Sequence, residues 1–288
     1  MTVRQIGLYI FYFMIAFVVF AFVLFPREQA AKKISQGLGQ IFPGIIIQMD
    51  RITPIFPLGI KCEAPVINLG NRFHLMPDDL VVKMPVSTIF KPGSEVIFSG
   101  TLFDGSIKGS VTDVSLTDNR FSGFELNLEN IKASKVICRI QNADLDISFD
   151  VKGQYIFTED KAKGNFILTQ VNARIKDSIF NRMGITELDF SSIELDFLQD
   201  EKKISLVKCI AKGNVMILHL KGDLIPTGNM FDALGDWSIE LKGFIQPQPA
   251  YISKFAGVSS MANLFKNNRE QGLPIRITGL LKAPEIKL

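Results

Sequence analysis

The pattern of hydrophobic and polar positions divides the chain into three parts. Residues 6–25 form an apolar run without a charge, residues 27–43 follow a helical period, and alternation of apolar and polar residues begins at Ile45. A period near 3.6 residues indicates an amphipathic helix, whereas a period of two indicates a strand with one buried face. The pattern therefore predicts an apolar helix, a short amphipathic helix and a long β-domain.

The apolar run has the length of a transmembrane helix, because roughly 20 residues cross the ~30 Å hydrocarbon core of a bilayer. The alternative is a cleaved signal peptide, whose apolar core is about 7–15 residues and ends in small neutral residues. Here the run is longer, and Arg27 and Glu28 follow it closely. We therefore predict that residues 1–26 are a short tail and an uncleaved anchor. The membrane-contacting residues expected in this anchor are Ile6, Phe11, Phe17 and Phe25.

The charges beside the run do not orient this anchor. Arg4 precedes it, while Arg27, Lys32 and Lys33 follow it. A count of basic residues would leave the large domain in the cytoplasm. A short tail before a long domain is instead the layout of a signal-anchor protein, so both orientations stay open at this point.

Residues 27–43 are predicted to form a juxtamembrane amphipathic helix that Pro43 ends. Ala31, Ile34, Leu38 and Ile41 fall on one face of it. This face either packs on the following domain or lies on the lipid surface.

Residues 44–288 alternate like half-buried strands, most clearly at 144–151. Turns between the runs are short, with signals at residues 103–105, 117–119, 151–153, 200–202 and 211–213. Short turns favour antiparallel pairing. The predicted strands span residues 60–69, 96–102, 110–116, 124–131, 144–151, 165–175, 193–198, 204–211, 215–224, 237–245 and 274–281.

The predicted fold is therefore mainly β. A single N-terminal transmembrane helix is followed by a long, curved, mostly antiparallel sheet and a C-terminal amphipathic helix over residues 250–266. Residues 177–183 are predicted to form a helical turn, and a subdivision of the β-domain is possible near 176–186.

Composition and motifs give catalysis no support. The 32 basic and 29 acidic residues are scattered, so no basic stripe indicates a nucleic-acid partner. His74 and His219 lie far apart, and no zinc, phosphate-loop or nucleophile motif is present. Paired carboxylates such as Asp144 and Asp146 sit on polar strand faces. We expect no catalytic, cofactor-binding or metal-binding residues, and no enzyme.

Three cysteines, Cys62, Cys138 and Cys209, lie inside strand-like runs. The favoured interpretation is that they are buried as small hydrophobes. One disulfide is the alternative in an oxidising compartment.

One strand run is apolar on both faces, from Val215 to Leu220. Either other elements cover both faces, or the sheet has an apolar concave face that holds acyl chains. His219 within the run is expected to be structural. The candidate groove residues are Val215, Ile217, Leu218 and Leu220.

The order of these segments resembles the type II secretion system protein N family over nearly the whole chain. The anchor ends in Phe25-Pro26, and a short helix and a strand pair at residues 52–60 follow. Glycine-spaced hairpins occur at 100–109 and 211–224, and residues 277–288 resemble the closing G-x-L-x-x-P strand, which AsmA-like envelope proteins share.

This resemblance implies a non-enzymatic accessory subunit of the type II secretion machinery in a Gram-negative inner membrane. It implies that the β-domain lies in the periplasm and contacts other secretion subunits. The alternative is an AsmA-like protein that binds or transfers envelope lipids, with phospholipid or lipopolysaccharide acyl chains in an apolar groove.

Overall fold

The computed structural model describes most of the β-domain and the helix before it. The described residues are 5, 8–9, 11–13, 16, 20, 22–41, 45–49, 51–69, 73–85, 95–113, 121–140, 143–158, 161–176, 187–200, 203–214, 216–226, 237–248, 272–281 and 283–287.

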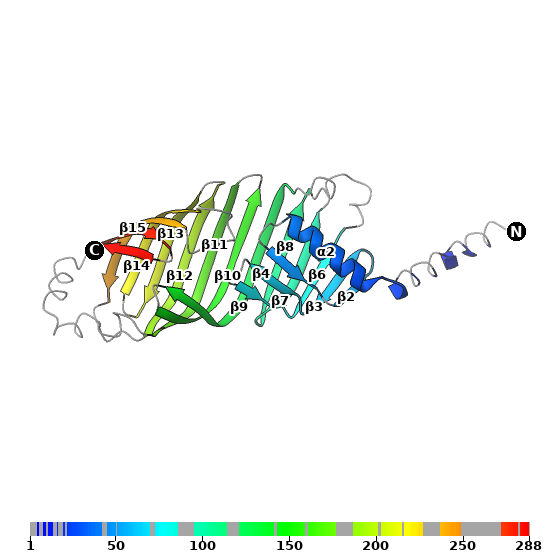
Figure 1. The fold of residues 1–288 in the computed structure, drawn as a ribbon, viewed down its shortest axis with the longest axis horizontal. Helices are drawn as coiled ribbons and strands as arrows, with labels where there is room; N and C mark the ends of the chain where they lie inside the picture. Colours follow the sequence, from blue (N-terminus) through cyan, green and yellow to red (C-terminus); the bar gives the residue numbers. More distant parts are fainter. Residues whose placement is uncertain are drawn as a thin grey trace.

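One antiparallel sheet of 14 strands dominates the structure (Figure 1). At about 4.8 Å between strands, it is about 60 Å wide. In spatial order its strands are β2 (Arg51–Ile55), β3 (Gly59–Glu63), β6 (Asp79–Lys83), β7 (Val96–Leu102), β8 (Gly105–Thr112), β9 (Gly123–Ile140), β10 (Ala143–Thr158), β11 (Lys161–Lys176), β12 (Glu187–Gln199), β13 (Ile204–Gly213), β14 (Met216–Ile225), β15 (Ser238–Pro247), β16 (Leu273–Leu280) and β17 (Ala283–Lys287).

A second sheet contains three short strands near the start of the β-domain. Its order is β1 (Ile45–Gln48), β4 (Val66–Leu69) and β5 (Phe73–Leu75). Helix α2 (Arg27–Ile41) precedes it and confirms the predicted amphipathic helix. The described architecture therefore confirms a mainly β, antiparallel fold.

The hairpin between β7 and β8 shows how local sequence directs this meander. Phe103 and Asp104 form its two-residue loop with φ angles of 48° and 61°. Positive φ at both loop residues is the turn whose twist matches antiparallel strands. Gly105 then begins β8, as the turn signal at this position predicts.

Several predicted strands are longer in the structure, among them β9, β10 and β12, and two other expectations are wrong. The expected strand at residues 60–69 breaks at Ala64, where φ is 47° and Pro65 follows, and its second half joins the small sheet. The turn expected at residues 151–153 lies inside β10, because Gly153 pairs with Leu128 and Phe166 on the neighbouring strands.

Two predicted helical segments, residues 177–183 and 250–266, fall outside the described residues. Strands β11 and β12 on either side of residues 177–186 pair with each other. The subdivision near 176–186 stays a prediction.

The described positions between residues 5 and 23 are helical. No helix in the described part of the chain is long and apolar enough to cross a membrane.

The apolar side of α2 packs on the first strands of the large sheet. Ala31 of the helix is buried with Met49, Ile52 and Cys62, and Ile34 packs against the same cluster. Packing on the domain, rather than lying on lipid alone, is therefore the observed arrangement of this helix.

Replacing Ile52 with alanine tests how much this contact stabilises the fold. Ile52 is 1% exposed, so truncation leaves a cavity and is expected to lower the free energy of unfolding by about 2–5 kcal/mol. Ile97→Ala is the control, because Ile97 is 44% exposed and its loss should cost under about 1 kcal/mol. Denaturant titration measures both, and equal effects would contradict the packing described here.

Candidate functional site

The large sheet has one apolar face, to which every strand contributes hydrophobic side chains. Side chains alternate along a strand, and cross-strand partners share a face. The pairing registers connect one apolar position to the next across all 14 strands. Its members, one from each strand between β2 and β17, include Ile52, Ile60, Leu80, Phe98, Ile107, Leu126, Val151, Leu168, Leu195, Cys209, Leu218, Ile239, Ile275 and Ile286.

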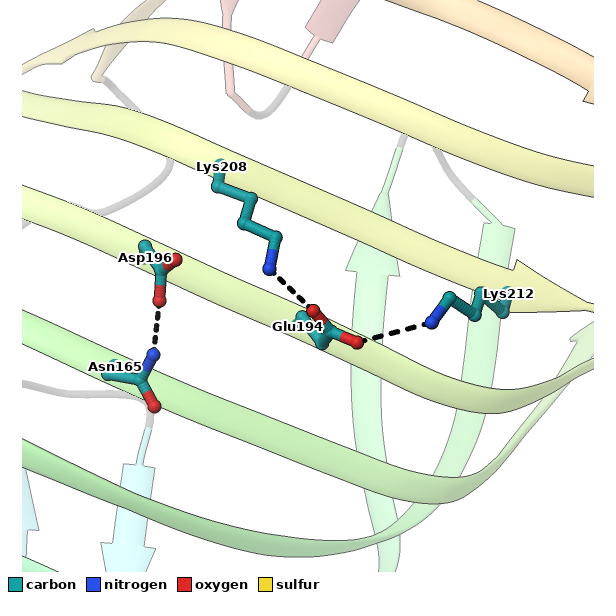
Figure 2. Close-up of polar contacts among 5 residues, drawn as sticks. All are labelled: Asn165, Glu194, Asp196, Lys208 and Lys212. Atoms are coloured by element: carbon teal, nitrogen blue, oxygen red, sulfur yellow. Dashed lines mark hydrogen bonds and ion pairs between the residues drawn. The ribbon is translucent and has the colours of Figure 1, made fainter.

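The opposite face is polar, as the centre of the sheet shows (Figure 2). Glu194 on β12 accepts hydrogen bonds from Lys208 at 2.6 Å and from Lys212 at 3.3 Å. These two ammonium groups hold the pKa of Glu194 below its usual range. Asn165 donates to Asp196 beside this group.

The polar face continues to the other strands in the same way. The Thr101 hydroxyl donates to Asp79 at 2.7 Å, and Lys61 lies 3.6 Å away. These contacts, with that of Thr101 the largest, lower the pKa of Asp79. Exposed ion pairs of this kind add little stability to the fold. Their charged side chains instead suit a face that contacts water.

Aromatic side chains form a ladder along the middle of the apolar face. Phe98 stacks on Phe124 at 5.8 Å between ring centroids, and Phe124 meets Tyr155 edge-on at 6.1 Å. Tyr155 lies 6.2 Å from Phe197, which stacks on Phe166 at 5.9 Å. The ladder spans strands β7 to β12 and gives the face a continuous aromatic surface.

Glycines on neighbouring strands make room for these rings. A Cβ added at any of three glycines would overlap a ring of the ladder, so the rings occupy the space that a side chain would fill. Aromatic rings that cover cross-strand glycines are a known way to stabilise a sheet. The three pairs are Gly109 with Phe98, Gly153 with Phe166, and Gly164 with Phe197.

Bulges bend the strands that carry the ladder. Asn130 in β9 and Gln170 in β11 have φ angles of 54° and 53°, at positions where the pairing register with β10 shifts by a residue. Similar shifts place an extra residue in β12 and in β13. A bulge bends its strand and increases its twist, and the strands bearing Asn165, Glu194 and Lys208 are bent in Figure 2.

The apolar face is buried towards both ends and half-buried along the ladder. Helix α2 and Met49 cover Ile52 and Cys62 at the β2–β6 end. Towards the other end, Cys209, Ile239 and Ile275 are also buried, at 9%, 4% and 7% exposed. The ladder residues between these ends are only half-buried.

Only part of the predicted groove lies on this face. Leu218 and Leu220 of β14 lie on the apolar face opposite Ile245 and Gly243. Ile217 is on the polar face, and Val215 falls outside the described residues.

His219 also lies on the polar face and stacks on Phe244 at 4.3 Å between ring centroids. Sequence reasoning missed the aromatic ladder, whose signal was a glycine opposite each of three phenylalanines. Those glycine–phenylalanine pairs can be recognised only when it is known which residues pair across neighbouring strands.

The two described cysteine side chains are buried, and neither is in a disulfide. Cys62 belongs to the cluster under α2, and burial raises the pKa of the Cys209 thiol. Both fit the favoured interpretation of small buried hydrophobes. The side chain of Cys138 is outside the described set, and the described residues contain no metal-binding cluster.

The predicted anchor residues have different surroundings. Phe11 is 63% exposed, and Phe20 in the same apolar run is also 63% exposed. Phe25 instead packs against the cluster under α2. Ile6 and Phe17 fall outside the described residues.

Comparison with family models, curated proteins and solved structures finds no match to this chain.

Proposed function

We propose that this protein is anchored in a membrane and binds phospholipid acyl chains on the apolar face of its sheet. The observation that carries the proposal is the apolar face itself, continuous over 14 strands and backed by a polar face. The aromatic ladder in its middle is only half-buried, and contiguous apolar surface that the fold leaves partly uncovered is typical of binding surfaces. Acyl chains suit a long surface without polar partners, because their burial needs no hydrogen bonds.

The anchor is part of the same proposal. Residues 6–25 have the length and apolarity of a membrane span, and their described large side chains, such as Tyr12 and Phe13, are 70% and 71% exposed. We place the β-domain in the periplasm of a Gram-negative cell on the strength of the sequence resemblance. Its role is binding, without a catalytic step.

The test is native mass spectrometry of residues 25–288, which retain Phe25 and the cluster under α2. The fragment is made in a bacterial periplasm and purified without detergent. Because it lacks residues 1–24, lipid that surrounds the predicted anchor is not purified with it. We expect a mass increase equal to whole phospholipid or lipopolysaccharide molecules, identified by fragmentation. An empty, folded fragment would contradict lipid binding.

The second candidate is an accessory subunit of the type II secretion system, favoured by the exposed edge of the sheet. Strand β17 is the last strand, and Ile286 on it is 56% exposed. An unpaired edge can accept a strand from a partner. Co-purification with secretion subunits would support this candidate, and unchanged secretion after loss of the protein would count against it.

A further inference from the structure

A cleft of about 610 Å³ lies between α2 and β1. This volume is within the range of small-molecule sites. In Figure 1, α2 lies over the β2–β6 end of the sheet, beside the N-terminal segment. The cleft is therefore at the end of the apolar face nearest the predicted anchor.

The floor of the cleft is continuous with the apolar face. Ala31 and Met49 line it and are 5% and 7% exposed. Both belong to the buried cluster that contains Ile52 and Cys62, the first members of the apolar face. An acyl chain in contact with Met49 would therefore be separated from that face by a single side chain.

The rim of the cleft is polar, unlike the floor. Lys32, Ser35 and Gln36 of α2 line it together with Gln48 of β1, all of them able to donate hydrogen bonds. Glu28 stands one helical turn before Lys32 on the same rim. One positive and one negative side chain match a zwitterionic headgroup better than an anionic one.

The cleft is also joined to the apolar segment before α2. Phe25 packs against the cluster that forms the floor. The residues just before it, Val23 and Leu24, are each 72% exposed, and Ile46 of β1 at the cleft is 58% exposed. Exposed apolar side chains combined with polar and charged ones are typical of a surface that meets lipid headgroups.

We propose that this cleft binds one zwitterionic phospholipid from the anchoring membrane and passes its acyl chains to the apolar face. An acyl chain lies against Met49 and Ile46, and the phosphate accepts hydrogen bonds from Lys32 and Ser35. The inference rests on the proposed function, because it names the site at which lipid enters the apolar face.

The test uses the full chain in its membrane, with a photoreactive phenylalanine analogue at either Ser35 or Phe197. Ser35 reports on the cleft and Phe197 on the distant apolar face. We expect phospholipid adducts at both positions. Ile46→Glu should lower both adducts at least tenfold, because it places a charge beside the acyl chain. Ile97→Glu, a matched change at an exposed isoleucine on the polar face, should lower neither.

The outcomes separate the cleft from the proposed function. An adduct at Phe197 that persists unchanged in Ile46→Glu would overturn entry through the cleft and leave lipid binding standing. The same conclusion follows from an adduct at Phe197 with none at Ser35. An adduct at Ser35 alone would overturn transfer to the apolar face, and the absence of both adducts would overturn both proposals.

Discussion

Replacing Leu195 with glutamate is expected to remove at least nine-tenths of the bound phospholipid, whereas Leu198→Glu should leave it bound. Leu195 lies on the apolar face opposite Phe166 and Cys209, so its substitution puts a carboxylate where an acyl chain would lie, at a cost of several kcal/mol. Leu198, three residues along the same strand, is on the polar face and 54% exposed. Native mass spectrometry of the two variants measures the bound lipid.

A second variant separates lost binding from lost folding. Leu195→Thr introduces a β-branched side chain that suits a strand and should lower bound lipid by a smaller factor with an unchanged circular dichroism spectrum. Equal lipid in the Leu195 and Leu198 variants, both folded, would show that the apolar face does not hold the lipid.

Gly243→Val is expected to destabilise the sheet by about 3 kcal/mol or more, as a severe case of overpacking. Gly243 of β15 pairs with Leu220 and Ile275, and an added Cβ would overlap the backbone carbonyl of His219. A backbone atom cannot rotate away, so the strands must separate. The free energy of unfolding from a denaturant titration gives the size of the effect.

The matched control is Lys242→Val, on the adjacent residue of the same strand. Lys242 is exposed on the polar face, and valine favours strands, so its change should be within about 1 kcal/mol. Similar stabilities for the two valine variants would mean that β14 and β15 do not approach as closely as described.

Local signals predicted most of the strands, because alternation and turn residues act within a few positions. The loop at Phe103 and Asp104 is an example, since two residues with positive φ determine the hairpin around them. The predicted strand at 96–102 coincides with β7 for the same reason.

The sequence alone did not show which residues face each other on neighbouring strands. Gly153 has the sequence signal of a turn, yet it lies inside β10 because the Phe166 ring of β11 fills the space beside it. Ile217, Leu218 and Leu220 are all apolar, but the alternation of β14 places Ile217 on the opposite face from the other two. Of the candidate groove residues, Leu218 and Leu220 therefore share the apolar face, and Ile217 does not.

The most direct test of the account is a photo-crosslinking scan of six consecutive residues in β12, from Ile193 to Leu198. The account predicts phospholipid adducts at Ile193, Leu195 and Phe197, on the apolar face, and none at the three alternate positions on the polar face. A period of two would assign lipid to one face of the sheet. Adducts at all six positions, or at none, would contradict lipid binding on the apolar face.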